Sequence, residues 1–121
     1  MQMFINKLKQ VGFRIIILHG NSFVAKYHDA LLIVTKNLDV SYCAVLINEK
    51  DFEILMVEFR RRNEEQGEYW YYDIGYIAYE MIKHKIINLY KNDAICSNAC
   101  TEDSIIFSIN KFINDGLYKK E

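Results

Sequence analysis

Hydrophobic and polar positions follow a helical period at the start of the chain and then an extended one. Over about residues 3–11 the apolar residues recur every three or four positions and Gly12 follows as a stop, which predicts a first helix. Four runs of β-branched and apolar residues then predict strands. These runs cover residues 13–18, 23–27, 30–35 and 40–47. His28 and Asp29 either interrupt one long strand or separate two short ones.

The connections between these strands are too short for crossover helices, so we expect a mostly antiparallel sheet. The apolar run at 13–18 is typical of a buried strand. Residues 68–72 predict either a further strand or the start of a helix, and residues 92–100 predict a loop.

Three helices are predicted after the strands, each from a capping residue and a helical apolar period. Asn48 is expected to cap a helix to about Glu65, and Asp73 one to about Lys91. Thr101 is expected to cap a last helix that Gly116 ends. The fold class is therefore α+β: a mostly antiparallel sheet of three to five strands with an N-terminal helix and about three helices after the strands. We expect the helices to pack on one face of the sheet.

Size and composition predict a single globular domain over residues 1–121. An apolar fraction of 51% with 26% charged residues is ordinary for a folded domain, and a net charge of −1 excludes a strongly basic nucleic-acid-binding protein. The chain starts without the pattern of a signal peptide and has no apolar run that could span a bilayer, so we expect a cytoplasmic protein without a membrane partner. Abundant Ile, Lys, Asn, Tyr and Phe indicate an AT-rich coding sequence, typical of an AT-rich genome or of mobile bacterial or phage DNA.

The most unusual segment is a cluster of aromatic residues. Five of the nine tyrosines and the only tryptophan lie between Tyr69 and Tyr79. The same region is acidic, since residues 37–80 carry ten acids against four bases, a net −6, whereas residues 1–36 carry a net +4. Tyrosine and tryptophan are common in protein interfaces as well as in cores. An aromatic and acidic surface indicates a basic protein partner.

The candidate chemistry elsewhere is sparse. Cys96 and Cys100 lie four apart, but a structural zinc site needs four ligands and no second pair is present, so we expect no metal and no cofactor. Cys43 is expected in the core. His19 and His28 could serve as the general acid and the general base of a nuclease, with Lys26 to stabilise the charged intermediate.

One basic run, at residues 60–62, could bind the phosphate backbone of a nucleic acid. Three successive helical residues point over about 200°, however, and nearby glutamates can pair with them, so we do not expect nucleic acid as the partner. The chain also lacks a nucleophile elbow, a phosphate-binding glycine loop, an HExxH motif and a dinucleotide fingerprint.

These observations predict a small bacterial binding protein without catalytic residues. The leading hypothesis is an immunity protein that neutralises a cognate toxin, such as a nuclease, by covering its active site. Its expected contact residues with the toxin domain are Glu64, Glu65, Glu68, Tyr69, Tyr71, Tyr72 and Asp73. The alternatives are a phage-encoded inhibitor of a host protein, an acid–base enzyme that uses His19 and His28, and a homodimeric structural protein.

Overall fold

A five-stranded antiparallel sheet is the middle layer of the structure, a computed structural model that describes residues 1–39, 41–66, 73–90 and 96–116. The strands follow one another in the sheet in the order of the sequence. They are β1 (Arg14–His19), β2 (Ser22–Tyr27), β3 (Ala30–Lys36), β4 (Tyr42–Asn48) and β5 (Cys96–Cys100). Short turns join the first four strands, so the predicted antiparallel sheet is confirmed, with His28 and Asp29 in the turn between β2 and β3.

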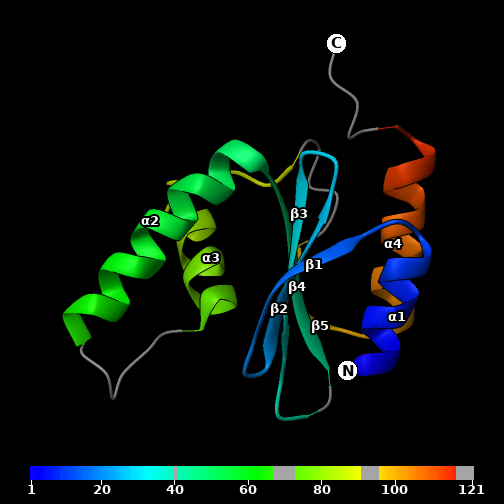
Figure 1. Cartoon of the computed structure of the whole chain (residues 1–121), viewed down its shortest axis with the longest axis horizontal. Coiled ribbons are helices and arrows are strands. Elements are labelled where there is room, and N and C mark those ends of the chain that lie inside the picture. The colour runs from blue at the N-terminus through cyan, green and yellow to red at the C-terminus, as the bar shows by residue number, and fades with distance from the viewer. Residues whose placement is uncertain (40, 67–72, 91–95, 117–121) are drawn as a thin grey trace.

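Helices cover both faces of this sheet (Figure 1). On one face lie α1 (Gln2–Gln10) and α4 (Glu102–Asn114), and on the other lie α2 (Glu49–Gln66) and α3 (Ile74–Lys83). The α+β class and the four helices agree with the prediction. The expectation that the helices pack on one face was wrong, because the central strands are apolar on both sides and each side needs a cover.

Alternate residues of the central strands supply two separate cores. Leu32 and Val34 of β3 pack with α1 and α4, whereas Leu31 and Ile33 pack with α2 and α3. In the neighbouring strand, Phe23 belongs to the first core and Val24 to the second. This alternation explains why β3 reads as an unbroken apolar run rather than as an alternating one.

The three predicted helix caps are confirmed. The Asn48 side chain accepts a hydrogen bond of 2.8 Å from the Asp51 amide, and Thr101 forms a reciprocal capping box with Ser104. Asp73 accepts hydrogen bonds from the first-turn amides of α3. A short polar side chain can accept from amides that have no partner inside the helix, so these helix starts could be located from the sequence.

The third predicted helix is shorter than expected. It ends at Lys83 rather than near Lys91, and Lys85 adopts a left-handed conformation with φ 61°. The Ile86 amide then donates to the Met81 carbonyl at 2.8 Å, which closes the helix end without a glycine. The early stop allows Ile87 to enter the α2–α3 core and Tyr90 to enter the α1–α4 core.

Two further expectations were wrong at the edges of the sheet. Part of the predicted loop at 92–100 is strand β5, which pairs with β4. At the other edge, β1 is not the buried strand that its composition predicts, because no residue of β1 is fully buried. A terminal strand has a neighbour on one side only, and composition alone does not indicate which strand is terminal.

The left-handed conformation of Lys85 leads to a stability prediction. We expect Lys85→Gly to raise the free energy of unfolding by up to about 1 kcal/mol, because relief of about 1–2 kcal/mol of backbone strain exceeds the entropy cost of a glycine. Urea unfolding measures the difference. The matched control is Lys83→Gly in the last turn of α3, which should lose about 1 kcal/mol, and an equal loss in both variants would contradict the prediction.

Candidate functional site

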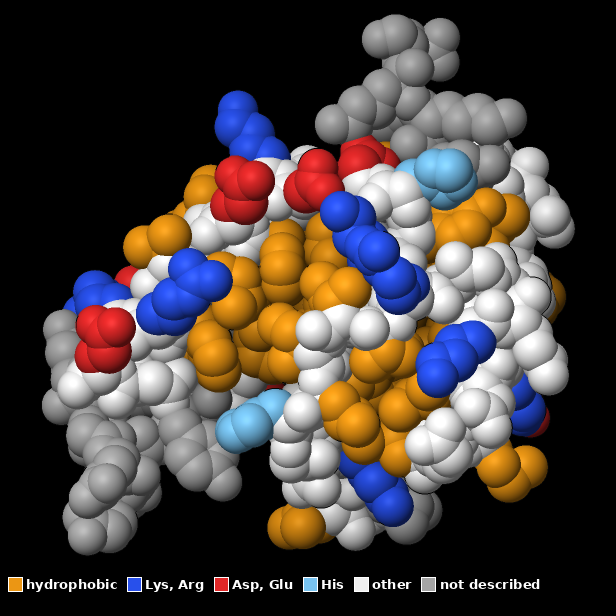
Figure 2. Space-filling model, viewed as in Figure 1, with side chains coloured by type: hydrophobic (Ala, Val, Ile, Leu, Met, Phe, Trp, Pro, Cys, Tyr) orange, Lys and Arg blue, Asp and Glu red, His pale blue; other side chains and the backbone are white. Residues whose placement is uncertain are grey.

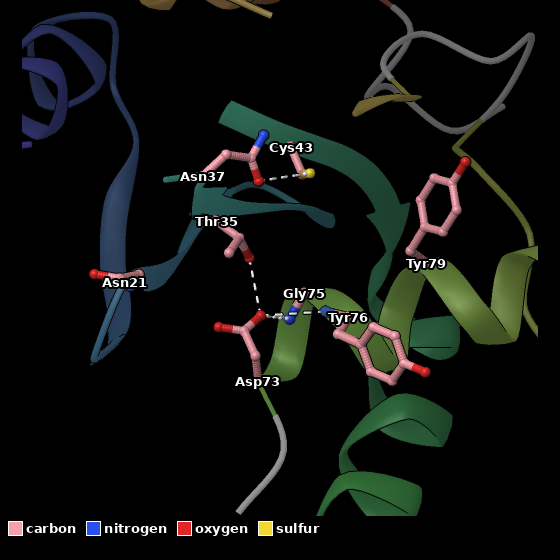
Figure 3. A pocket seen from close by; sticks show the side chains of 8 residues that line it. All are labelled: Asn21, Thr35, Asn37, Cys43, Asp73, Gly75, Tyr76 and Tyr79. Carbon is pink, nitrogen blue, oxygen red and sulfur yellow. Dashed lines mark hydrogen bonds between the residues drawn. The ribbon is translucent and has the colours of Figure 1, made fainter. Parts of the chain in front are cut away.

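A hollow of about 330 Å³ lies where the N-terminal end of α3 meets one end of the sheet, and we call it the α3 pocket. Its walls come from the turn between β1 and β2, the ends of β3 and β4 that lie next to each other, and the first turns of α3 (Figure 3). The lining residues are Asn21, Thr35, Asn37, Cys43, Asp73, Gly75, Tyr76 and Tyr79. A hollow of this size can accept a small molecule or a side chain of a protein partner.

The Asp73 carboxylate holds the helix against the sheet at this pocket. One oxygen accepts hydrogen bonds from the Gly75 amide at 2.8 Å and the Tyr76 amide at 3.2 Å, and from the Thr35 hydroxyl at 3.0 Å. The other oxygen accepts from the Ser22 hydroxyl, which is buried. Asp73 therefore caps α3 and joins it to β2 and β3 through hydrogen bonds to a charged group, which are the stronger kind.

Gly75 allows this close approach of helix and sheet. A Cβ atom at this position would overlap the Thr35 hydroxyl oxygen. The glycine sits in the first turn of α3, where its missing side chain leaves room for Thr35 to reach Asp73. The position therefore selects glycine for space rather than for its backbone conformation.

Cys43 and Asn37 lie next to each other in the wall of the pocket (Figure 3). The Cys43 thiol donates a hydrogen bond to the Asn37 side-chain oxygen at 3.3 Å. Cys43 is half-buried and faces the pocket, so the expectation that it belongs to the core was wrong. Its neighbours in the strand, Tyr42 and Ala44, point to the opposite side, into the α1–α4 core.

Two tyrosines of α3 form the aromatic rim of the pocket. Tyr76 is 56% exposed and Tyr79 is 40% exposed, although Ile77 and Ala78 beside them are fully buried. The Tyr76 hydroxyl donates to a carboxylate oxygen of Glu80 at 3.1 Å. Two tyrosines one helical turn apart therefore present a broad contact surface next to a hollow.

Ion pairs link α2 to α3 beside this rim. Arg62 contacts Glu58 on its own helix at 2.6 Å and Glu80 on α3 at 2.8 Å, and Arg61 also contacts Glu58. The hydrogen bonds from Arg61 and Arg62 lower the pKa of Glu58 to about 2, and the hydrogen bond from Arg62 lowers the pKa of Glu80. Two of the three successive arginines are thus engaged by carboxylates, as expected for a solvated helix end.

Three of the seven residues predicted to contact a partner lie in the described part of the chain, two on α2 and one at the start of α3. Glu64 is exposed near the end of α2, and Glu65 belongs to the same helix. Asp73 is half-buried with both carboxylate oxygens engaged, so its role in this structure is to position α3. The other four predicted contacts, Glu68, Tyr69, Tyr71 and Tyr72, lie outside the described residues.

The two candidate catalytic histidines lie at opposite ends of β2. His19 pairs with Ser22 at its start, and His28 follows Tyr27 at its end. A strand of six residues spans about 20 Å, so the structure does not bring the two imidazoles to one reacting atom. Lys26 forms an ion pair with Glu49 at the start of α2.

Comparison of the chain with protein-family models, with curated proteins and with solved structures found no match. Among the residues that the structure describes, no three His, Cys, Asp or Glu side chains are grouped so that they could hold a metal ion. In the same part of the chain, no helix is both long enough and apolar enough to cross a membrane.

Sequence reasoning missed most of the α3 pocket because its polar lining comes from separate turns and strand ends. Asn21, Thr35 and Asn37 belong to no motif, and only the fold brings them together. Tyr76 and Tyr79 belong to the aromatic cluster but are not among the predicted contact residues. A helical projection from the predicted cap at Asp73 would have placed both away from the buried Ile74, Ile77 and Ala78.

The close approach at Gly75 predicts a specific coupling with Thr35. We expect Gly75→Ala to lower the free energy of unfolding by about 1–2 kcal/mol, because crowding exceeds the gain in helix propensity. The loss should shrink in a Thr35→Ala background, which removes the obstructing hydroxyl, and should persist with Thr35→Ser, which keeps it. Urea unfolding of the double-mutant cycle measures this coupling, and equal losses in all three backgrounds would refute it.

The low pKa of Glu58 predicts a pH-dependent contribution to stability. The pKa of Glu58 is about 2 in the folded protein and 4.5, its ordinary value, in the unfolded chain. The ionised Glu58 carboxylate therefore stabilises the fold above pH 4.5, and this stabilisation is lost as the pH falls toward 2. We expect Glu58→Gln to cost about 1 kcal/mol or less above pH 4.5, since the partner arginines are partly exposed to water, and to cost less at lower pH. Urea unfolding of Glu58→Gln and the wild type across this pH range measures the difference in stability. The matched control is Glu53→Gln, at an exposed site on the same helix. A difference for Glu58→Gln that does not change with pH would contradict the prediction.

Proposed function

We propose that this chain is a binding protein that recognises another protein through its α3 surface, which consists of the α3 pocket with Tyr76 and Tyr79 at its rim. The more specific proposal is an immunity protein or a similar inhibitor. It would neutralise a toxin, such as a nuclease, by covering the toxin's active site rather than by a reaction of its own.

The exposed pair of tyrosines beside a hollow is the observation that carries this proposal. The buried face of α3 already supplies Ile74, Ile77 and Ala78 to the core, so Tyr76 and Tyr79 are not needed there. A tyrosine offers a large apolar ring and a polar tip, and it loses little conformational freedom when it is bound. Residues of this kind beside a pocket are typical of the few positions that carry most of the binding energy in an interface.

The charges near the α3 surface support a basic partner. Glu64 is exposed near the end of α2, and Glu80 lies one turn from Tyr76. Arg61 and Arg62 pair with Glu58 and Glu80 and balance their charge, and the net charge of −6 over residues 37–80 remains after the four bases of that stretch are counted. A nuclease active site is positively charged because it binds phosphates, and an acidic inhibitor complements it.

The pocket gives the surface a shape that a flat acidic patch would lack. A side chain of the partner can enter the hollow and meet the polar groups of Asn21 and Asn37, with the two tyrosines packed around it. The rigid attachment of α3 through Asp73 keeps this shape before binding, which lowers the entropy cost of association.

Calorimetric titration into the C-terminal domain encoded immediately upstream of this chain tests the proposal. We expect one-to-one binding that abolishes the toxicity of that domain. The double variant Tyr76→Ala/Tyr79→Ala should bind at least about tenfold more weakly, a loss of about 1.4 kcal/mol, since both rings contact the partner.

The matched control is Phe107→Ala, which removes a 72% exposed aromatic ring from α4 on the opposite face of the sheet. It should bind like the wild type. Absence of binding and of protection would refute the inhibitor proposal, and an equal loss in the control would refute the assignment to the α3 surface.

A further inference from the structure

A second hollow, of about 340 Å³, lies where β1 begins and β2 ends, and we call it the β1–β2 hollow. Its lining consists of Gly12, Arg14, Lys26, Tyr27 and His28. Two of these residues are bases and a third is a histidine, and among the described residues no carboxylate belongs to the lining. Figure 2 shows Lys and Arg side chains over the sheet in the middle of the molecule, whereas most of the Asp and Glu side chains in this view lie over α2. The β1–β2 hollow is therefore a concave and basic part of the surface.

Strand pairing places the two bases of this hollow next to each other. Arg14 of β1 lies directly opposite Lys26 of β2, so both side chains project from the same face of the sheet with their Cβ atoms about 5 Å apart, and their like charges repel. The Lys26 ammonium contacts the Glu49 carboxylate at 2.5 Å. Arg14 is exposed and forms no ion pair with a described carboxylate. The two bases thus have one carboxylate between them, which leaves one positive charge at the hollow.

His28 adopts an unusual backbone conformation beside these bases. It lies in the turn between β2 and β3 and is left-handed, with φ 57°. Glycine adopts this conformation without strain, so the backbone alone would favour glycine at this position. The imidazole of His28 instead lines the hollow with the two bases. Residues held in such conformations are concentrated at ligand-binding and active sites, so the turn and the charges both indicate a ligand here.

We propose that the β1–β2 hollow binds the phosphate group of a small soluble molecule, such as a phosphate monoester or a diphosphate. The planar guanidinium of Arg14 can donate to two phosphate oxygens at once, and Lys26 adds a second positive charge. An N–H group of the His28 imidazole supplies a further donor. A bound dianion also relieves the repulsion between the two opposed bases. The volume of about 340 Å³ is at the lower end of the range of ligand pockets, as expected for a small molecule.

This site binds phosphate without the means to cleave it by acid–base chemistry. The sequence predicts a pair of histidines with Lys26 for a reaction at phosphorus, but only His28 and Lys26 reach the hollow. His19 pairs with Ser22 at the other end of β2, about 15–20 Å away along the strand. The hollow therefore has donors and charge for a phosphate group but no second imidazole beside His28.

The β1–β2 hollow is also separate from the α3 surface and from any inhibitor function. Ser22, which bonds to Asp73 at the α3 pocket, begins β2, whereas Tyr27 at the hollow ends it. Failure of toxin binding would leave the phosphate site untouched, and failure of phosphate binding would leave the α3 surface untouched.

A nuclear magnetic resonance titration of the full chain with pyrophosphate, at constant ionic strength, tests the site. We expect saturable one-to-one binding with a dissociation constant below about 1 mM, and shifts of the backbone amides of Gly12, Arg14, Lys26 and His28. Arg14→Gln should bind at least about tenfold more weakly, because it removes the base that has no carboxylate partner. The Arg14 side chain is exposed and unpaired with described carboxylates, so this variant should keep the wild-type circular dichroism spectrum.

His28→Gly separates binding from folding. It should also weaken pyrophosphate binding, yet the protein should unfold at the same or a higher urea concentration than the wild type, because glycine suits the left-handed conformation. A merely structural role for His28 predicts no change in binding.

The matched control is Lys36→Gln, which removes the same charge from the end of β3 and should bind like the wild type. Shifts that do not saturate, or an equal loss in Lys36→Gln and Arg14→Gln, would mark an adventitious ion only and overturn the proposal. Unchanged binding in both Arg14→Gln and His28→Gly would also overturn it. A single-stranded oligonucleotide, or vesicles of a phosphate monoester lipid, that binds more tightly than pyrophosphate through Arg14 would overturn the assignment to a small soluble molecule.

Discussion

The hydrogen bonds of one carboxylate, that of Asp73, determine where helix α3 sits. The side chain closes the first turn of α3 by accepting from two amides, and it also accepts from hydroxyls of β2 and β3. Without it, the hydrogen bonds that join the start of the helix to Ser22 and Thr35 would be lost, and of these two hydroxyls, which lie 2.8 Å apart, only one could donate to the other. The hollow between α3 and the strand ends depends on this attachment, together with the packing of Ile77 and Met81 in the core. The residues that attach α3 to the sheet, Asp73 and Thr35, therefore also line the α3 pocket.

Much of the fold was predictable because it depends on local signals. Side chains that cap helices, such as Asn48 and Thr101, identify helix starts within one turn, and turns between apolar runs identify antiparallel neighbours. The errors concern long-range packing. Apolar residues on both sides of β3 need a cover on each face, but the pattern does not say which helix supplies it. Similarly, Lys85 gives no sign that it adopts a left-handed conformation, and the residues of β5 contain no apolar run that would indicate a strand.

The candidate site was predictable only in its general region. The acidic and aromatic residues 64–80 include the start of α3, where the α3 pocket lies, and the cap at Asp73 was predicted. Which tyrosines are exposed depends on the rotation of α3 about its axis, which the packing of Ile74, Ile77 and Ala78 determines. The polar lining depends on the register of three strands, because Asn21, Thr35 and Cys43 become neighbours only when those strands pair. Residue types alone do not carry this information.

The order of the strands has a consequence for how the chain folds. Strands β1 to β4 form a meander of neighbouring hairpins, so their pairing closes only short loops. The pairing of β4 with β5 instead joins Tyr42 to Cys100, and the loop that it closes contains α2 and α3. Closing a long loop costs more chain entropy, so the meander forms more readily than the contact with β5. During synthesis on the ribosome, β4 therefore remains an unprotected edge until the last quarter of the chain has emerged, and this interval is when the nascent protein is most prone to mispairing.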